Sequence, residues 1–379
     1  MKPLVMAVFG TRPEAVKMAP LVLALQACSE FDTALTVTAQ HREMLDQVLD
    51  LFDLTPDHDL DLMKAGQTLV DITGRVLTHM TPVLTERRPA LVLVHGDTTT
   101  TFAASLAAFY QQIPVGHVEA GLRTPDRYNP FPEEMNRRLT TQLTSLHFAP
   151  TQTSVDNLLR DGVAAEAIYK TGNTVIDALL MTARKLPANP SAEGRQILVT
   201  AHRRENWGEP MGNICRAVRR LAEANPDVRV LFPIHRNPVV RETANAILGG
   251  HPRITLTEPF DYAPFVAAMR DSTLILTDSG GVQEEAPSLG KPVLVMRTTT
   301  ERPEAITAGT VKLVGVDEDA IFDTAQQLLD DPVAYERMAR SVNPYGDGQA
   351  CARIVEAVRF FLGLRDTRPN EAFEPALSR

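Results

Sequence analysis

The stretch that decides the fold covers residues 274–304 and reads LILTDSGGVQEEAPSLGKPVLVMRTTTERPE. It begins with an apolar, β-branched run that is typical of a buried strand. It then turns at Ser279-Gly280-Gly281 and continues into a helix that carries Glu284 and Glu285. Free backbone N–H groups and the helix dipole make such a turn an anion site, and the nearby carboxylates suit the hydroxyls of a ribose or a sugar. The stretch therefore predicts a nucleotide whose phosphates lie on the turn; the alternative is a tight strand–helix connection without a ligand.

Strand and helix patterns alternate along the whole chain. Short apolar runs predict strands at Leu4–Phe9, Leu35–Ala39, Leu91–His95, Val115–Glu119, Leu146–Ala149, Ala167–Thr171, Ile197–Thr200, Val228–Pro233, Ile254–Thr257, Leu274–Thr277, Val293–Met296 and Lys312–Val314. Helical patterns lie between most of them, among others at Glu14–Gln26, Met44–Phe52, Thr68–Arg87, Thr101–Gln111 and Asn213–Ala224. Because the strands are apolar throughout, the alternation predicts parallel sheets that helices cover on both faces.

A change of composition divides the chain into two parts. The helical pattern Thr174–Leu186 is followed by a linker-like segment rich in Pro and small residues, Pro187–Gly194. We therefore predict an α/β protein with two doubly wound, Rossmann-like domains, at 1–174 and 175–349. A C-terminal helix at about 350–365 would join the first domain, and residues 366–379 would form a frayed tail. In this architecture ligands bind at the carboxyl ends of the strands, so we expect a cleft between facing domains.

Composition limits the class of protein. The net charge is −9, with 38 basic and 47 acidic residues, which argues against a surface that coats nucleic acid. The cysteines, Cys28, Cys215 and Cys351, show no metal or redox spacing and fit a reducing cytosol. No segment resembles a signal peptide or approaches the roughly 20 apolar residues of a membrane span. We expect a soluble, cytoplasmic protein that binds neither nucleic acid nor membranes.

Charged side chains follow the strand ends in the first half of the chain. Arg12 and Lys17 could reach one anion at the start of the first helix, although Lys17 also suits a solvated helix position. Asp97 closes a strand, and its alternative role is that of a turn or N-cap residue. Glu119 ends the next strand, where access of water is restricted; the alternative is a structural ion pair with Arg123.

Two adjacent acids begin a later helix in the same half. Glu133 and Glu134 precede Arg137 by about one turn. A favourable position in the helix dipole would be enough to explain Glu134.

Histidines and arginines follow strand ends in the second half. His202 and Arg203 come directly after one strand, and His235 occupies a similar place after the next. The chain has no His-x-x-x-His and no paired cysteines, which gives no metal signature. It also has no Gly-x-Gly-x-x-Gly after a strand, no Walker loop and no Gly-x-Ser-x-Gly. We therefore expect no metal and no nicotinamide cofactor.

Long motifs follow one another in a fixed order from about Met1 to about Phe361. They read GTRPEAVKMAP, TAQHREMLDQVL, VHGDTTTTFAASLAAFY, GHVEAGLRT, PFPEEMNRRLT, TGNTVIDALL, TAHRREN, LTDSGGVQEEAPSLGKPVLVMR and TTERPEA. Together they resemble the motifs of the non-hydrolysing UDP-N-acetylglucosamine 2-epimerases. The resemblance implies the two-domain fold of the nucleotide-sugar glycosyltransferases (GT-B), no cofactor, usually a homodimer, and a role in supplying cell-surface polysaccharide.

The resemblance also implies a reaction. UDP leaves C1 of UDP-N-acetylglucosamine (UDP-GlcNAc), which acidifies the proton on C2, and loss of that proton gives 2-acetamidoglucal. Addition of UDP and a proton from the other face gives UDP-N-acetylmannosamine. The matched positions for proton transfer and its support are Asp97, Glu119, Glu133, Arg137 and His202. Those for UDP are Arg12, Lys17, Phe260, Phe265, Ser279, Gly280, Gly281, Glu285 and Arg302.

Finer roles follow from the same resemblance. Glu285 would hold the ribose, Arg302 would lie in the nucleotide pocket and Phe265 in the uracil pocket, while Asp97 would be the main proton-transfer residue. Some relatives bind a second UDP-GlcNAc as an activator, and the matching positions are Gln40, His41, Arg203 and His235. Here the chain departs from the family, because it has Glu43 and Gly66 where some members have Gln and Arg, and Phe260 where one has Gln.

Three other functions remain as alternatives. A glycosyltransferase of the same fold would consume nucleotide sugar only with an acceptor. A hydrolysing epimerase would release free N-acetylmannosamine with UDP. A sensor of UDP-sugars would bind without turnover, although the presence of all four predicted acid–base residues argues against it.

Overall fold

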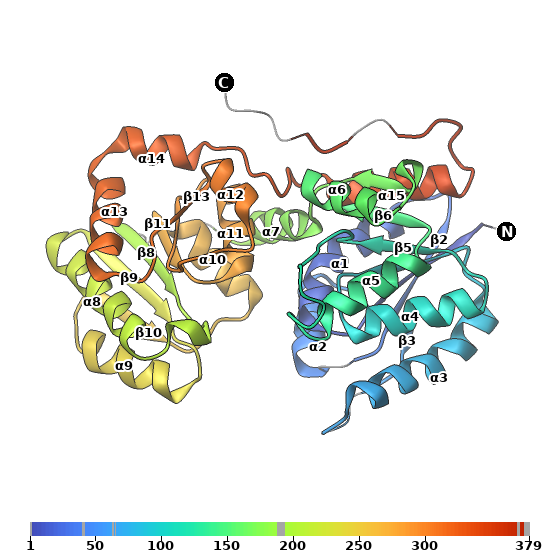
Figure 1. Cartoon of the computed structure of the whole chain (residues 1–379), viewed down its shortest axis with the longest axis horizontal. Coiled ribbons are helices and arrows are strands. Elements are labelled where there is room, and N and C mark those ends of the chain that lie inside the picture. The colour runs from blue at the N-terminus through green and yellow to red at the C-terminus, as the bar shows by residue number, and fades with distance from the viewer. Residues whose placement is uncertain are drawn as a thin grey trace. The chain divides into compact units, whose positions relative to one another are not determined.

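The structure is a computed structural model that describes residues 2–39, 42–62, 64, 66–187, 194–369 and 372–374. The chain divides into two compact units (Figure 1). Unit 1 comprises Met1–Ala178 and Gly346–Glu374, and unit 2 comprises Leu179–Tyr345. Each unit contains a parallel sheet with helices packed against it, which confirms the predicted α/β class with two doubly wound sheets.

Unit 1 is built on a seven-stranded sheet of order β3-β2-β1-β4-β5-β6-β7. Its strands are β1 (Leu4–Phe9), β2 (Asp32–Val37), β3 (His58–Asp59), β4 (Leu91–His95), β5 (Val115–Val118), β6 (Leu146–Ala149) and β7 (Ile168–Lys170). Its helices are α1 (Arg12–Gln26), α2 (Arg42–Leu51), α3 (Leu69–Arg87), α4 (Thr99–Tyr110), α5 (Glu133–Leu143), α6 (Gln152–Arg160), the start of α7 (Thr174–Lys185), and α15 (Ala350–Phe361).

Apolar residues on both faces of the strands explain why helices flank this sheet. Met6 and Val8 of β1 pack in a buried cluster with residues of α3 and α4. The alternate residues of β1, among them Ala7 and Phe9, are buried as well. Since neighbouring side chains of a strand point to opposite faces, both faces of the sheet are covered.

The C-terminal part of the chain completes unit 1. Asp177 in α7 accepts hydrogen bonds from the first backbone N–H groups of α15, those of Ala350 (3.2 Å) and Cys351 (2.9 Å). Farther on, Phe373 is 2% exposed, and its N–H donates to the Lys170 carbonyl oxygen. The composition predicts a frayed tail at 366–379. The described residue Phe373 differs from that expectation, because its aromatic side chain is buried and its backbone is bound to β7.

Unit 2 contains a six-stranded sheet of order β10-β9-β8-β11-β12-β13. Its strands are β8 (Arg195–Thr200), β9 (Val228–Pro233), β10 (Ile254–Thr257), β11 (Leu274–Thr277), β12 (Val293–Val295) and β13 (Val311–Leu313). Its helices are α8 (Glu209–Ala224), α9 (Pro238–Leu248), α10 (Tyr262–Asp271), α11 (Gly280–Glu285), α12 (Pro303–Thr307), α13 (Glu318–Asp330) and α14 (Pro332–Ala339). Its main core joins the sheet to α8, α9 and α13.

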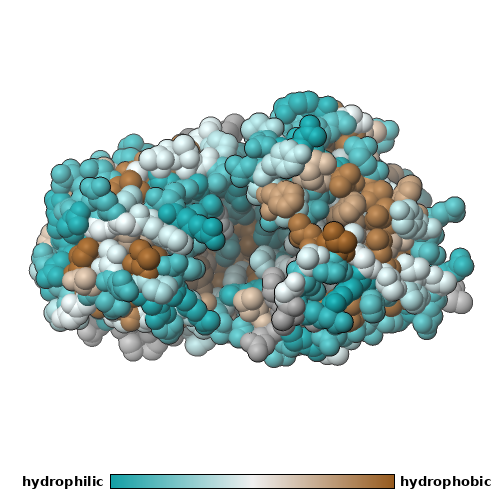
Figure 2. Space-filling model, turned by 60° about the horizontal axis from the view of Figure 1, so that its bottom comes forward, coloured by the Kyte–Doolittle hydropathy of each residue, from teal (hydrophilic) through white to brown (hydrophobic). Residues whose placement is uncertain are grey.

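The surface of unit 1 carries exposed apolar side chains. Figure 2 shows hydrophobic residues gathered in the half of the view that this unit occupies. At the end of α4, Phe109 and Tyr110 are 55% and 65% exposed, and Leu139 on the neighbouring α5 is 40% exposed. Within the described ranges, no helix combines the length and the apolar character needed to cross a membrane.

Candidate active site

The strand order places one reversal point in each sheet. In unit 1 the order reverses between β1 and β4, and in unit 2 it reverses between β8 and β11. The loops that leave the carboxyl ends of such a strand pair run to opposite sides of the sheet, and the crevice between them is where doubly wound proteins bind ligands. Many of the polar residues singled out in the sequence lie in or beside these loops.

A buried glutamate joins the two loops at the reversal point of unit 1. Glu14 Oε2 accepts from the backbone N–H groups of Gly10 (3.0 Å) and Thr11 (2.7 Å), in the loop after β1. Its Oε1 accepts from the hydroxyls of Thr98 (2.7 Å) and Thr101 (3.1 Å), after β4. Glu14 is only 2% exposed, so these bonds fix the loop that starts α1 against the loop that carries Asp97.

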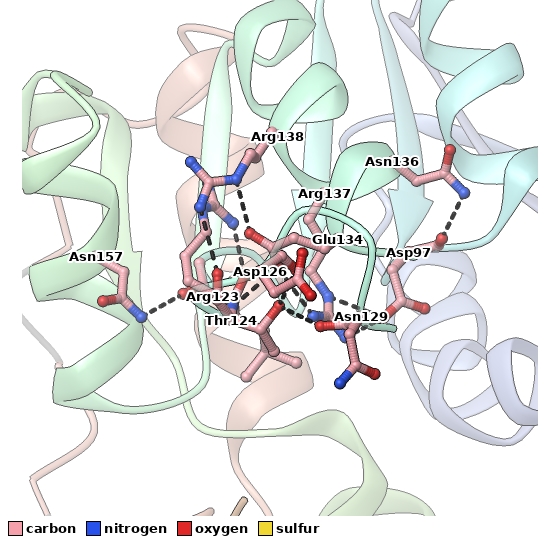
Figure 3. A network of polar contacts seen from close by, with 12 residues as sticks. Asp97, Arg123, Thr124, Asp126, Asn129, Glu134, Asn136, Arg137, Arg138 and Asn157 are labelled. Atoms are coloured by element: carbon pink, nitrogen blue, oxygen red, sulfur yellow. Dashed lines mark hydrogen bonds and ion pairs between the residues drawn. The ribbon is translucent and has the colours of Figure 1, made fainter. Parts of the chain in front are cut away.

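Asp97 is held by an arginine from α5 (Figure 3). Arg137 donates from Nε (3.0 Å) and Nη2 (2.7 Å) to the same oxygen of Asp97, Oδ2. The third side of the guanidinium reaches Glu134 Oε2 at 3.2 Å. Glu134 is fully buried and also accepts from Arg138 and from the Thr124 N–H. Glu134 thus holds Arg137 in place, beyond the favourable dipole position that could already explain it.

Glu119 follows the adjacent strand, β5, and has an unusual backbone conformation. Its φ is +62°, a region that non-glycine residues seldom adopt and that is found at functional sites. Its Oε2 lies 2.5 Å from Lys17 Nζ, accepts from Asn173 Nδ2 at 3.0 Å, and is 3.4 Å from His95 Nε2. Burial would raise the pKa of Glu119, but Lys17 and His95 outweigh burial and hold that pKa well below its ordinary value.

The alternatives for these acids can be compared with the contacts. Arg123 pairs with Asp161 at 2.7 Å, so the ion pair with Glu119 considered from sequence does not form. The N-cap of α4 is Thr98, so Asp97 does not serve as that cap, but it does lie in the turn before it. Glu133 is the first residue of α5, as expected, and among the described residues its Oε2 is buried with no hydrogen-bond partner.

Unit 2 repeats the bridging arrangement with an aspartate. Asp278 lies after β11 and is fully buried. It accepts from the backbone N–H groups of His202 (2.9 Å) and Arg203 (2.9 Å), which follow β8, and from Asn206 Nδ2 (3.0 Å). Burial would raise the pKa of Asp278, but the His202 ring, 3.1 Å away, and the backbone donors lower it. Asp278 therefore fixes both the backbone and the imidazole of His202.

The Ser279-Gly280-Gly281 turn begins α11 and is surrounded by cations. A Cβ atom at Gly280 would lie 3.8 Å from the Nη2 atoms of both Arg203 and Arg302. Arg302 Nε also donates to Glu284. Two guanidinium groups beside free N–H groups at a helix start are suited to an anion such as a phosphate.

A carboxylate lies on the other side of the same turn. A Cβ at Gly281 would lie 3.6 Å from Glu285 Oε1. The charge of Glu285 also raises the pKa of the Tyr262 hydroxyl, although burial of that hydroxyl is the larger cause. Glu285 is therefore near both the turn and the start of α10.

The remaining predicted residues lie at the edges of these loops. Arg12 is half-buried in the first turn of α1. Phe260 precedes α10, which contains Phe265, and both are half-buried. The His235 ring stacks on His202, with centroids 6.2 Å apart. Gln40 and His41 lie outside the described residues.

Sequence reasoning missed the two buried bridging acids, Glu14 and Asp278. Each was visible in a quoted motif, directly after or a few residues beyond a strand end. The sequence does contain a signal for both, because each acid lies within four residues of a glycine and a hydroxyl residue near a strand end, which are local hydrogen-bond donors. The described residues contain no group of three or more His, Cys, Asp or Glu side chains placed to hold a metal ion.

Comparison with known proteins identifies the family. Residues 23–359 match the family described as UDP-N-acetylglucosamine 2-epimerase. The chain belongs to the UDP-N-acetylglucosamine 2-epimerase family. The resemblance seen in its motifs is confirmed, and with it the class of enzyme, an isomerase.

Individual members of the epimerase family are similar over nearly their whole length. The UDP-N-acetylglucosamine 2-epimerase of Bacillus subtilis is 56% identical over 370 residues, 97% of each chain. A crystal structure of a UDP-N-acetylglucosamine 2-epimerase has a TM-score of 0.93 at 54% identity, with 99% and 100% of the two chains covered. The UDP-GlcNAc 2-epimerase of Neisseria meningitidis, solved bound to UDP-GlcNAc, has a TM-score of 0.82 at 52% identity over 94% of this chain and 99% of that one. These similarities confirm the GT-B-like fold that was predicted for this chain.

Proposed function

We propose that this chain interconverts UDP-GlcNAc and UDP-N-acetylmannosamine by eliminating UDP and adding it back. The observation that carries the proposal is the pair of carboxylates, Asp97 and Glu119, that follow the adjacent strands β4 and β5. Each carboxylate is bound to a cation, Asp97 to Arg137 and Glu119 to Lys17. Inversion at C2 removes a proton from one face and adds one to the other, which requires more than one acid–base group.

The leaving group needs positive charge where its own charge develops. As UDP departs from C1, negative charge grows on the β-phosphate, and fixed donors stabilise it without reorganising. We assign this role to the Gly280 turn with Arg302 in unit 2, and we predict that Arg12 and Lys17 of unit 1 also bind UDP. Glu285 would bind the ribose, and Phe260 and Phe265 the base. The Neisseria meningitidis relative, solved with UDP-GlcNAc, supports this choice of substrate.

Proton transfer falls to unit 1 in this proposal. Asp97 has both Arg137 bonds on Oδ2, which leaves Oδ1 as the oxygen that would meet the C2 proton. Glu119 and Glu133 would be its partners, and the ring of His202 would assist departure of the diphosphate. The overall reaction neither oxidises nor reduces the sugar, so its electron balance requires no redox cofactor.

Solvent exchange tests the proposal directly. In deuterium oxide, without any sugar acceptor, the chain should equilibrate the two epimers and place deuterium at C2. A glycosyltransferase would need an acceptor, and a hydrolysing epimerase would accumulate N-acetylmannosamine together with UDP. Turnover without deuterium at C2, or thermal stabilisation by UDP-GlcNAc without any turnover, would contradict the epimerase assignment.

We further propose that the chain forms a homodimer through the apolar surface of α4 and α5. Phe109, Tyr110 and Leu139 are exposed on these two helices, which pack against each other, and exposed apolar surface favours association. Replacement of Phe109 and Tyr110 by Glu should convert the dimer to a monomer in analytical ultracentrifugation. A wild-type chain that sediments as a monomer at all concentrations would contradict this proposal.

Activation by a second UDP-GlcNAc remains a prediction as well. Arg203 and His235 lie next to His202, so a ligand bound to them would adjoin the proposed site. Sigmoidal dependence of the rate on UDP-GlcNAc, abolished by His235→Ala, is the expected result. A hyperbolic curve in the wild-type chain would count against activation.

A cytoplasmic location and a role in polysaccharide supply also belong to this proposal.

A further inference from the structure

Three buried histidines lie on neighbouring strands of unit 1. His95 on β4, His117 on β5 and His147 on β6 are 3%, 0% and 2% exposed. His117 and His147 are paired in register, and His95 is paired with the residue after His117. Buried imidazoles are uncommon in the apolar centre of a parallel sheet, and packing alone does not require polar rings there.

The His117 ring makes a specific contact with the loop after β4. Its Nε2 lies 2.7 Å from the carbonyl oxygen of Gly96. Burial, reinforced by the nearby His147, His95 and Arg123, lowers the pKa of His117 to about 3, so the ring is neutral well above that pH. A carbonyl oxygen can only accept, so the single ring proton must be on Nε2. His117 therefore donates a permanent hydrogen bond to Gly96.

The Gly96 carbonyl belongs to the peptide group that joins Gly96 to Asp97. Gly96 has a φ of +67°, which suits glycine, and its own N–H donates to the Val118 carbonyl oxygen at 2.9 Å. The backbone carbonyl oxygen of Asp97 itself accepts a hydrogen bond from Asn136 Nδ2 at 2.9 Å. The backbone on both sides of Asp97 is thus tied to neighbouring elements, and the contact with His117 lies directly before the Asp97 Cα.

We infer that His117 is a positioning residue that fixes the direction of the Asp97 carboxylate through the Gly96 carbonyl. The inference rests on the proposed function, in which Asp97 transfers the C2 proton. Rotation of the Gly96–Asp97 peptide would move the Asp97 Cβ. The carboxylate would then be displaced from the position in which Oδ2 accepts both bonds from Arg137. Small displacements of a reacting group, of about 1 Å, can slow an enzymatic step by about 100-fold.

This role can be tested with substitutions that place a hydrogen-bond donor at different distances from the backbone. The amide nitrogen of Gln extends about as far as imidazole Nε2, whereas that of Asn extends only about as far as Nδ1. We expect His117→Leu and His117→Asn to lower kcat for epimerisation and for C2 deuterium exchange by about 10- to 100-fold, with little change in KM. His117→Gln should restore kcat to within a few-fold of the wild type. Because the ring is neutral, the loss should not vary with pH in the range where the chain is stable.

His147 provides the matched control. It is a buried neighbour on β6, and its polar contact is with the backbone of Thr144, far along the chain from Asp97. His147→Asn should leave kcat close to the wild-type value, whatever it does to the melting temperature. If His117→Leu does not fold, the comparison of His117→Asn with His117→Gln still decides the matter.

The outcomes separate this inference from the proposed function. Absence of C2 exchange in the wild-type chain would refute the function itself. Exchange in the wild type with equal kcat for His117→Asn and His117→Gln would overturn only the positioning role. A loss of kcat that is the same in His147→Asn as in His117→Asn would also overturn it, because it would show a general effect of polar substitution in the sheet.

Discussion

Lys17 Nζ and Glu119 Oε2 are 2.5 Å apart, with their side chains 20% and 12% exposed. Lys17 comes from α1 and Glu119 follows β5, so the pair connects elements that are 102 residues apart in sequence. The cation keeps a buried carboxylate ionised against the cost of desolvation. In the proposed function, a diphosphate that attracts Lys17 would weaken this hold and make Glu119 a stronger base.

Lys17→Met should therefore change how stability depends on pH. Glu119 has a lowered pKa in the folded state, so it contributes stability above its ordinary pKa of 4.5, and that contribution is lost as the pH falls toward the folded-state pKa. Without Lys17, only His95 would oppose the effect of burial, so the pKa of Glu119 would be higher than in the wild type. Removing one partner of a buried pair costs about 3–5 kcal/mol. Urea unfolding should show this loss at neutral pH and a smaller one below pH 4.5.

Lys17→Arg is the control for that experiment, since it keeps the charge. It should retain most of the wild-type stability at neutral pH. A loss in Lys17→Met that is equally large at neutral and acidic pH would contradict this account, because it would show that the loss does not depend on the ionisation of Glu119.

Asp97→Asn should abolish most of the exchange at C2. The amide keeps the shape of the side chain but cannot accept the proton, and loss of a general base lowers kcat by about 100- to 10,000-fold. Deuterium incorporation followed by NMR measures the effect. Asp126→Asn, in an exposed loop that is also labelled in Figure 3, serves as the control and should keep the wild-type rate. Full exchange by Asp97→Asn would refute its assignment as the main proton-transfer residue.

Gly280→Ala should weaken UDP binding without unfolding the chain. A Cβ at this position meets its nearest atoms at 3.8 Å, which is ordinary van der Waals contact. It would occupy the space between the guanidinium groups of Arg203 and Arg302 where we place a phosphate. We expect UDP affinity in calorimetry to fall by at least about tenfold, or about 1.4 kcal/mol.

The control for this glycine is Gly74→Ala, within α3 of unit 1, where a Cβ meets nothing within 4 Å. It should stabilise the helix by up to about 1 kcal/mol and leave UDP binding unchanged. Wild-type affinity in Gly280→Ala would place the phosphates elsewhere.

Asp278→Asn should destabilise unit 2 and disturb His202 together. An amide nitrogen would face the backbone N–H groups that now donate to the carboxylate, and unsatisfied buried donors cost about 1–3 kcal/mol each. Because the pKa of Asp278 is lowered in the folded state, its stabilisation is present above its ordinary value of 3.8 and is lost as the pH falls further. Urea unfolding should show that the difference in free energy of unfolding between wild type and variant becomes smaller in acid. A difference that is constant with pH would contradict this account.

Much of the fold was predictable because it depends on local apolar patterns. The predicted bounds of β1, β4, β6, β9, β10 and β11 agree with the structure. β3 was missed, since it has only two residues, His58–Asp59, at the edge of the sheet and no apolar run. β2 begins at Asp32, earlier than predicted, because pairing with β1 extends it beyond its apolar part.

The site was predictable in its residue types but not in its contacts. The motif order pointed to Asp97, Glu119 and Arg137, but pairing over long sequence distances has no local signature, so the partnership of Glu119 with Lys17 in place of Arg123 could not be read from it. For the same reason the bridging roles of Glu14 and Asp278 appear only when the two loops are seen side by side.

The return of the chain to unit 1 has a consequence for biosynthesis. The described residues of unit 2 all lie between Leu179 and Tyr345, whereas unit 1 lacks α15 until the ribosome has made Gly346–Glu374. During translation, unit 2 has all its strands and helices before the earlier-made unit 1 does. The face of α1 that packs on α15 therefore stays uncovered until Ala350–Phe361 has been synthesised. Nascent chains stalled before Ala350 should be the ones that chaperones bind most.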